Sequence, residues 1–529
     1  MTWDLLGQLL GQQLSLWWII WPGILLGIVV GFLPGFNAEN TLIMLLPVTL
    51  AMPVGHALAF MTSLYCATHL GGGIPAILVR IPGTPGAAAT TLDGYPLTQQ
   101  GRGQFALVLS FVASVFSGLI SAVVTVALLP WLSVMGLYLR SVEMVVIMLF
   151  GLTLIAVIAA KDTLKGLIAG LFGLLIGVIG TDHIYNTPRA TFGFLELYDG
   201  VPLVPALIGL FAVAEALMMV ERKLIVGVDS RARASGHDWG QTLEALRYST
   251  KRWWHIVWTG LIGLVIGIVP GAGASIASFV AYQQSRMWSK TPEKYGHGAP
   301  DGVIAAEGGN NGVCSGTLVP MMALGVPGGS TAAVMMIVLQ YHGMVMGPTL
   351  FADKPELAYG VFVGMLLSYV FMIFTIFPLA RYMSRIVLIE TTYLVPIIIL
   401  VTVVAAFSER QYMFDMGVAI VFGIIGYIAH KTDYHVSAIL IGVILGPIFE
   451  KYLVRSLRLS EGDPRILFSS TTGNVLWTLL VISLLMPAFL GWFTKRYDVA
   501  YPAQDASPGG GGLGPLPKSN LRVAITKRA

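Results

Sequence analysis

Two stretches of this sequence repeat one pattern of glycines and a proline. Gly23–Ala38 reads GILLGIVVGFLPGFNA, and Gly263–Ala274 reads GLVIGIVPGAGA. Four positions agree in order: Gly27, Gly31, Pro34 and Gly35 match Gly263, Gly267, Pro270 and Gly271. Each stretch is an apolar run that ends in a Pro-Gly pair, a combination that stops a helix. The pattern therefore predicts one helix in each half of the chain, broken at the same point.

The similarity between the two halves continues along the chain. Further matches are Gly71 with Gly316, Ile81-Pro82-Gly83 with Val326-Pro327-Gly328, Pro130 with Pro378, Glu143 with Glu390, and Phe172-Gly173 with Phe422-Gly423. The partners lie 236 to 250 positions apart and keep their order. Such a series indicates that a half-chain was duplicated and that small loops then changed length.

Composition places the chain in a membrane. Of its 529 residues, 56% are hydrophobic and 11% are charged, and the mean hydropathy is +0.78. Soluble domains carry about 25% charged residues, so this chain cannot cover a water-facing surface. A net charge of +4 is too small to indicate a nucleic-acid partner. The two cysteines, Cys66 and Cys314, predict neither a disulfide framework nor a metal site.

A bilayer-spanning helix needs about 20 apolar residues. The candidates are 16–34, 104–130, 143–160, 163–180, 201–220, 254–270, 357–380, 386–407, 413–429, 436–450 and 470–493. We expect the first to be a membrane segment, because it lacks the basic start and the cleavage site of a signal peptide. The fold class predicted is an all-α polytopic membrane protein of about 10–12 transmembrane helices in two inverted repeats. Paired re-entrant or broken helices and an extra C-terminal helix complete it.

Five regions follow from this pattern. They are a first transmembrane repeat (1–220), a basic cytoplasmic linker (221–252), a second repeat (253–455), the extra C-terminal transmembrane helix (456–495) and a disordered tail (496–529). The linker has seven basic and four acidic residues, so the positive-inside rule places it in the cytoplasm. The basic loop 451–469 conflicts with simple alternation from a cytoplasmic tail, which leaves the topology there open.

Two regions, 35–100 and 271–350, are apolar but interrupted by Gly, Pro and Asn. A membrane tolerates a broken helix only where protein or a water-filled cavity surrounds it. Paired breaks in two halves are typical of a transporter's midplane site, where half-helix N-termini suit an anion and unwound carbonyls suit Na⁺. Close helix packing through small residues is the alternative.

Polar residues gather at these breaks and are the candidate substrate- and ion-binding residues. In the first half they are Pro34, Gly35, Asn37, Thr41, Arg80, Gly83, Thr84, Thr90 and Asp93. In the second half they are Gly271, Ser275, Glu307, Asn310, Asn311, Gly328, Ser330 and Thr331. A Na⁺ ion would be held by Asn37, Thr41, Asn310 and Asn311, since amide and hydroxyl oxygens are acceptors. Each hydroxyl can instead cap a helix or bond a carbonyl one turn back.

Two charged residues stand out because charges at membrane depth are costly and usually functional. Arg80 lies in PAILVRIPGTPG, and its forked guanidinium matches a substrate carboxylate. The alternatives for Arg80 are snorkelling to the interface or pairing with Glu39. Glu307 precedes Gly308-Gly309-Asn310-Asn311 and is either a proton or sodium carrier or a structural residue.

These motifs resemble those of the large permease subunit of the tripartite tricarboxylate transporters, the TctA family. The resemblance rests on LPGF before Asn37, IPGTPGAAATTLDGYP from Ile81, PGAGA from Pro270, AEGGNN around Glu307, LGVPGG from Leu324, and GPTLF ending at Phe351. It implies an importer of an organic di- or tricarboxylate in the bacterial cytoplasmic (inner) membrane, driven by a Na⁺ or H⁺ gradient. The implied partners are a small TctB-like membrane subunit and a periplasmic TctC-like binding protein.

The sequence departs from the family's pattern at two places. Leu70-Gly71-Gly72-Gly73 stands where the family usually has a Tyr-Gly-Gly-Ser-like stretch, and Arg80 stands where Asn is usual. The carboxylate class is expected to hold, while the particular substrate does not follow. The alternatives are a transporter or channel for another small solute without a binding protein, or an intramembrane enzyme. We expect neither catalytic residues nor a cofactor, because the chain has no HExxH and no G-x-S-x-G motif.

Overall fold

The structure is a computed structural model. It describes residues 3–33, 37–137, 139–159, 163–181, 187–221, 239–347, 349–386, 391–408 and 410–482. The predicted linker lies mostly outside these ranges, as do the residues after Ile482. The five predicted regions therefore stay predictions, although the described part of the last helical region is helical from Thr471 to Ile482.

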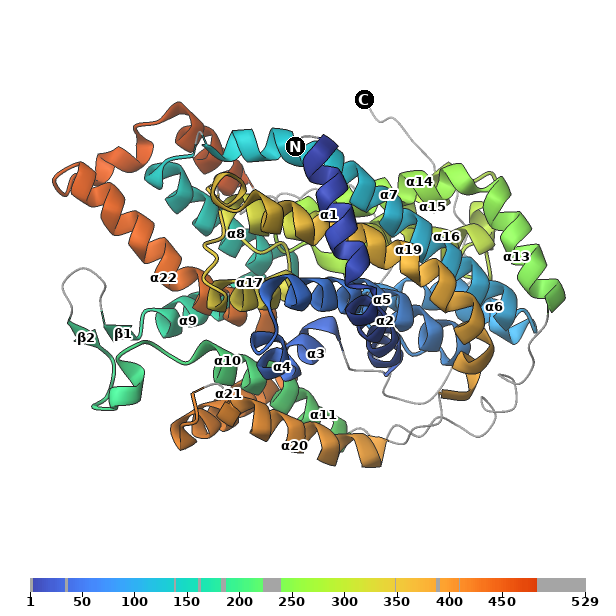
Figure 1. Cartoon of the computed structure of the whole chain (residues 1–529), viewed down its shortest axis with the longest axis horizontal. Coiled ribbons are helices and arrows are strands. Elements are labelled where there is room, and N and C mark those ends of the chain that lie inside the picture. Colours follow the sequence, from blue (N-terminus) through green and yellow to red (C-terminus); the bar gives the residue numbers. More distant parts are fainter. Residues whose placement is uncertain are drawn as a thin grey trace, which may run out of the picture. The chain divides into compact units, whose positions relative to one another are not determined.

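The first half is helical apart from one pair of strands (Figure 1). Its α-helices are α1 (Trp3–Ser15), α2 (Trp17–Phe32), α3 (Ala38–Met44), α4 (Leu46–Leu50), α5 (Val54–Val79), α6 (Thr91–Gln99), α7 (Gly103–Leu137), α8 (Ser141–Ala159), α9 (Thr163–Gly177), α10 (Leu203–Leu207) and α11 (Ala214–Glu221). Between them lie the 3₁₀ turns η1 (Pro85–Ala88) and η2 (Leu195–Leu197) and the π-helical η3 (Ile208–Val213). The strands β1 (Gly180–Thr181) and β2 (Pro188–Arg189) pair antiparallel, with Gly180 opposite Arg189.

The second half repeats this order of helices. Its α-helices are α13 (Trp239–Lys251), α14 (Trp253–Ile268), α15 (Gly273–Trp288), α16 (Pro300–Leu324), α17 (Ser330–Tyr341), α18 (Leu350–Asp353), α19 (Pro355–Ile386), α20 (Thr391–Ser408), α21 (Met413–Lys431) and α22 (Val436–Leu459). The 3₁₀ turns η4 (Pro292–Lys294) and η5 (Pro464–Phe468) complete it.

The prediction of an all-α polytopic membrane protein is confirmed. Five described helices are long and apolar enough to cross a membrane: Gly103–Trp131, Leu203–Glu221, Pro355–Ile376, Met413–Lys431 and Val436–Leu459. The α1–α2 pair, bent by 67°, makes a sixth if it is one span. Four other predicted segments contain shorter apolar helices: Ser141–Thr153, Leu164–Gly177, Trp253–Ile268 (α14) and Thr471–Ile482. The expected number of 10–12 crossings therefore stays a prediction.

The helices of the two halves interlock. Within each half, α2 packs along α5 and α14 packs along α16. Across the halves, α7 packs on α14 and α16, while α19 packs on α5; likewise α9 packs on α22 and α21 on η3. The long helices α5 and α16 are buried over nearly all their length, so they form the centre of the molecule.

Glycines set the close approach of the paired helices. A Cβ on Gly27 of α2 would lie 2.6 Å from the Leu64 carbonyl oxygen of α5, and one on Gly263 of α14 would lie 2.5 Å from the Gly309 oxygen of α16. Real Cβ atoms do not approach this closely, so these positions require glycine. The repeated glycines predicted from the sequence therefore allow close helix packing. A binding site would have to lie elsewhere, at the breaks that follow these helices.

Candidate functional site

The breaks of both halves meet at one cavity of about 600 Å³. Of the predicted site residues, six line it: Asn37, Thr84, Gly271, Ser275, Ser330 and Thr331. Pro34 and Gly35 lie outside the described residues. The structure therefore brings together polar positions that are nearly 300 residues apart in the sequence, and their binding role stays a prediction.

Three helices of twelve or more residues begin at the wall of this cavity. They are α15, α17 and α22, whose first residues or preceding residues line it. No side chain caps the N-terminus of any of the three. The first backbone N–H groups of a helix have no partner within the helix and carry a partial positive charge. The helix starts therefore favour an anion, while three acidic residues, Glu39, Glu215 and Asp433, line the same cavity.

Two buried polar atoms on different walls of the cavity have no hydrogen-bond partner among the described residues. They are the Oγ1 of Thr84, at the first-half break, and the Nδ1 of His435, just before α22. A buried polar atom normally has a partner, and an exception calls for an explanation. The Thr84 hydroxyl faces Gly72 of α5, since a Cβ there would overlap it. Among the described residues no lysine or arginine lines the cavity, so an anion here would be held by N–H, hydroxyl and imidazole groups.

Backbone hydrogen bonds hold the breaks in place. The Gly83 N–H donates to the Gly72 carbonyl at 3.1 Å, and the Gly328 N–H donates to the Thr317 carbonyl at 3.2 Å. The Gly271 N–H donates to the Gly328 carbonyl at 2.9 Å, which ties the two second-half breaks together. Gly83 and Gly328, both predicted site residues, thus position the cavity wall and do not line it.

A carboxylate bridges the breaks of the two halves. The Glu39 side chain accepts from the Thr331 hydroxyl at 3.0 Å and from the Asn37 amide at 3.3 Å. The Thr41 hydroxyl donates to the Asn37 carbonyl at 3.1 Å, the local bond that was the alternative to sodium binding. Because Thr41 does not line the cavity, the predicted Na⁺ ligands Asn37 and Thr41 are joined to each other but face different surroundings.

A buried polar cluster lies behind the cavity, between α16 and the first half. The Thr90 hydroxyl donates to Glu307 at 2.6 Å, and the Ser114 hydroxyl donates to its other oxygen at 2.8 Å. One turn on, Asn310 pairs twice with His69: its Oδ1 lies 2.9 Å from the His69 Nδ1, and its amide donates to the His69 carbonyl at 3.1 Å. His69 lines the cavity, so this pair connects the cavity with the cluster.

The neighbouring Asn311 has a different role from Asn310. Its amide lies 3.4 Å from the Glu307 carbonyl one turn back, and its Oδ1 is buried without a partner among the described residues. Asn310 and Asn311 both lie behind the cavity and not on its wall. The predicted four-residue Na⁺ site is therefore spread over two places.

Arg80 and Asp93 lie away from the cavity. Arg80 ends α5 in a left-handed conformation (φ 62°), is exposed, and places its guanidinium 6.0 Å from the Tyr95 ring centroid. The cavity geometry gives no support to a substrate contact by Arg80. Asp93 accepts from the backbone N–H groups of Gly296, Gly298 and Ala299, and from the Tyr282 hydroxyl. It fixes the loop that leads into α16.

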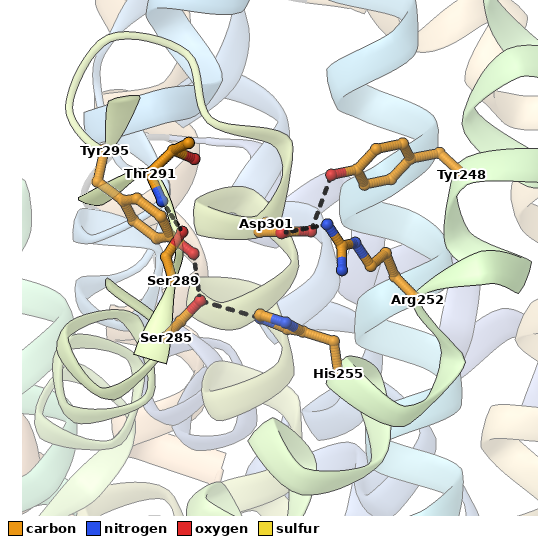
Figure 2. A network of polar contacts seen from close by, with 8 residues as sticks. All are labelled: Tyr248, Arg252, His255, Ser285, Ser289, Thr291, Tyr295 and Asp301. Carbon is orange, nitrogen blue, oxygen red and sulfur yellow. Dashed lines mark hydrogen bonds and ion pairs between the residues drawn. The ribbon is translucent and has the colours of Figure 1, made fainter. Parts of the chain in front are cut away.

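A polar network anchors the first turn of α16 to α13 and α14 (Figure 2). The Tyr248 hydroxyl donates to Asp301 at 2.9 Å, and the Arg252 guanidinium lies 3.2 Å from the other Asp301 oxygen. Burial, together with the charge of Asp301, raises the pKa of Tyr248 to about 12. On the facing side, the Ser285 hydroxyl joins His255 and Tyr295. This network holds α16 at its N-terminal end.

Several residues that line the cavity were missed by the sequence analysis. They are Tyr65 and His69 of α5, Glu215 of α11, and His430, Asp433 and His435 around the α21–α22 turn. The last three lie in the polar run HKTDYH between two apolar segments, which has the composition of an ordinary connecting loop, so no signal in the sequence distinguished them. His69 lies inside α5.

Comparison with known proteins fits this architecture. Residues 17–441 match the sequence model of the tripartite tricarboxylate transporter TctA family. The chain belongs to the TctA family. It is 29% identical to an uncharacterized 52.8 kDa protein in the TAR-I ttuC' 3' region of Agrobacterium vitis, over 88% of this chain and 91% of that protein. It is 27% identical to an uncharacterized protein in the TAR-II ttuC' 3' region of the same organism, over 45% of this chain and 98% of that protein. No solved structure matches the chain.

Family membership makes the chain a component of a membrane transporter. In the part of the chain that the structure describes, no group of three His, Cys, Asp or Glu residues is placed to hold a metal ion. Cys66 and Cys314 are both buried and free.

Proposed function

We propose that this chain is the large permease subunit of a tripartite, ion-gradient-driven secondary transporter. It imports an organic di- or tricarboxylate that a periplasmic binding protein delivers to the bacterial cytoplasmic membrane. The observation that carries the proposal is the cavity at which the uncapped N-termini of α15, α17 and α22 meet. Helix N-termini in a membrane protein bind anionic substrate groups through free N–H groups and the helix dipole.

The cavity wall supports a substrate with more than one carboxylate. The N-termini of α15 and α17 belong to the second-half breaks, whereas α22 follows the α21–α22 turn, and each helix start can hold one carboxylate group. The residues Thr84 and His435 line the cavity beside these helix starts. Partial charges and hydroxyls release an anion more readily than arginine does, which suits a carrier that must let its substrate go.

The acidic residues of the cavity support cation coupling. Glu39, Glu215 and Asp433 line it together with the helix starts. A carboxylate substrate would be repelled by these groups unless a cation enters with it.

The test is uptake by proteoliposomes that contain this chain with its small TctB-like membrane subunit. Radiolabelled citrate (a tricarboxylate) and radiolabelled succinate (a dicarboxylate) are each offered with and without the TctC-like binding protein. We expect uptake of at least one of the two, only when all three proteins and an ion gradient are present. Uptake at the same rate without the binding protein would contradict the tripartite mechanism. No uptake of either under any gradient would contradict the carboxylate class.

A further inference from the structure

Three carboxylates are buried completely in the described structure. Asp415 is paired with Arg410, whereas Asp93 and Glu307 form no ion pair among the described residues, and the surroundings of these two differ. Asp93 receives three backbone N–H groups, at 2.8, 2.8 and 2.9 Å, and the Tyr282 hydroxyl at 2.9 Å. Backbone N–H groups cannot leave, and several of them stabilise the ionised form of a carboxylate. Asp93 therefore has four donors for its charged form, although burial still raises its pKa above the usual value.

Glu307 receives fewer hydrogen bonds than Asp93. Its two oxygens accept only from the Thr90 and Ser114 hydroxyls and from the side chain of Asn310. No lysine or arginine among the described residues lies within ion-pair distance of Glu307, and its side chain is 0% exposed. Hydroxyls can turn and either donate or accept, so they serve a charged and a neutral carboxyl equally well. A buried carboxyl without a counter-charge favours the neutral form.

A partner for the neutral form is present. Ser110 of α7 is fully buried, and its Oγ has no hydrogen-bond partner among the described residues. A Cβ on Gly73 would lie 2.6 Å from Glu307 Oε1 and 2.9 Å from Ser110 Oγ. Both oxygens therefore border the same small space at Gly73. A protonated Glu307 has one O–H to donate, and the Ser110 oxygen is a nearby acceptor once either side chain turns toward the other.

The titratable groups on the helices packed against α16 do not supply a permanent counter-charge. They are His69 on α5, Asp93 on α6, His255 on α14, Tyr282 on α15 and Tyr369 on α19, together with Cys314 on α16 itself; α7 presents serines. Of these, His69 and His255 alone can become cationic. His69 is committed to Asn310, and His255 to Ser285.

We propose that Glu307 binds and releases the coupling proton of transport, and this inference rests on the proposed function. In the loading step a carboxylate oxygen of Glu307 forms an O–H bond with a proton from water on the outer side. In the release step that bond breaks toward water on the inner side, and no other co-reactant is needed. Asn310 and His69 connect the site to the cavity, so the charge of Glu307 affects a bound anion. Substrate and proton then enter together.

The main experiment compares Glu307→Gln with wild type in the complete three-protein system, in proteoliposomes loaded and driven with radiolabelled citrate or succinate. Gln keeps the shape of a protonated Glu. At an inward pH difference of about one unit, wild type should accumulate substrate up to about tenfold per coupled proton, because one pH unit is a factor of ten in proton activity. Glu307→Gln should not accumulate substrate, yet should exchange labelled for unlabelled substrate at equilibrium. Retained accumulation, or accumulation driven by a sodium gradient at equal pH, would overturn the proposal and leave the carboxylate transporter intact.

A matched pair of serines on α7 separates coupling from stability. Ser114 donates to Glu307, whereas Ser117 donates to the Ser114 carbonyl at 3.3 Å within the helix. Ser114→Ala should shift the pH of half-maximal accumulation, and Ser117→Ala should leave it unchanged. Equal behaviour of the two variants would contradict the role of the hydroxyl at Glu307.

A second readout needs no transported substrate and remains available if citrate and succinate are both refused. Infrared difference spectra of the purified complex between acidic and alkaline pH should show the carbonyl band of a protonated carboxyl group. The band should be absent in Glu307→Gln and present in Ser117→Ala. Its persistence in Glu307→Gln would assign the proton elsewhere.

Discussion

The C-terminal ends of α5 and α16 share one backbone conformation and one pattern of hydrogen bonds. In α5 the Ile81 N–H donates to the Pro75 carbonyl at 3.3 Å, and in α16 the Val326 N–H donates to the Pro320 carbonyl at 3.3 Å. The residue that ends each helix is left-handed in both, at φ 62° for Arg80 and 72° for Gly325. The difference between the halves therefore lies in the side chains.

That difference assigns separate tasks to the two halves. The position of α5 equivalent to Glu307 is Thr62, whose hydroxyl donates to the Leu58 and Ala59 carbonyls of its own helix. The second half contributes Glu307, and the first half contributes two of its hydrogen-bond donors, Thr90 and Ser114. The two similar helices therefore carry different polar groups at equivalent positions.

The largest expected loss of stability comes from adding a side chain at the equivalent glycines of the two breaks, Gly83 and Gly328. A Cβ on Gly83 would overlap the Gly31 carbonyl oxygen, and one on Gly328 would lie 2.6 Å from the Thr317 oxygen. Adding a methyl group where there is no room lowers the free energy of unfolding by about 1–3 kcal/mol. Because the atoms that the new Cβ would meet belong to the backbone and cannot turn away, we expect both Gly83→Ala and Gly328→Ala to lie toward the upper end of this range. The control is Gly55→Ala, because a Cβ there meets nothing within 4 Å. Thermal unfolding in detergent measures all three. Equal melting temperatures for Gly83→Ala and Gly55→Ala would show that the breaks are not held by this contact.

The next effect is at the contact between the halves. Asn310→Ala removes both bonds to His69 and leaves two buried groups unpaired, at about 1–3 kcal/mol each. Asn311→Ala removes only the 3.4 Å local bond. We expect Asn310→Ala to abolish uptake and lower the melting temperature, and Asn311→Ala to lower uptake while the protein still inserts in the membrane. A larger melting shift for Asn311→Ala would contradict this ranking.

A smaller effect distinguishes the two helix ends. Arg80 holds a left-handed conformation that glycine adopts freely, so Arg80→Gly should raise stability by about 1 kcal/mol and leave the half-saturation for substrate unchanged. Gly325→Ala should lower stability by a similar amount. If Arg80→Lys or Arg80→Gly instead raises the half-saturation about tenfold, the substrate contact predicted from the sequence holds after all.

The smallest expected effect is at the start of α16. The second half joins α14 to α16 through Arg252 and Asp301, whereas the first half has Trp18 against His56, with ring centroids 5.8 Å apart. Tyr248→Phe removes one hydrogen bond to Asp301 and should cost at most about 1 kcal/mol. The half-exposed Arg252–Asp301 pair should weaken as salt is added. A loss of uptake in Tyr248→Phe would give this network more than an anchoring role.

The sequence was sufficient to predict the repeated helices and their breaks. Close approach of two backbones requires glycine at Gly27 and Gly263, and the Pro-Gly pairs end a helix. It was also sufficient to place Asn37, Thr84 and Ser330 at breaks that converge. It could not separate residues that line the cavity from those behind it, such as Glu307, because both kinds are polar and adjoin the same glycines. The cavity wall around His435 was missed because it comes from a turn outside the repeated motifs.

The central claim is that one anion occupies a cavity shared by both halves. The most direct measurement is protection of Ser275→Cys and Ser330→Cys, each in the three-protein complex, from a small membrane-impermeant thiol reagent. Both positions start helices at the cavity, and the native cysteines are buried. A transported carboxylate at saturation should slow labelling of both by about tenfold or more, as expected for sites occupied most of the time, and should not slow labelling of Ser460→Cys beyond the end of α22. Unchanged labelling at Ser275 and Ser330 with a substrate that the complex transports would contradict the account.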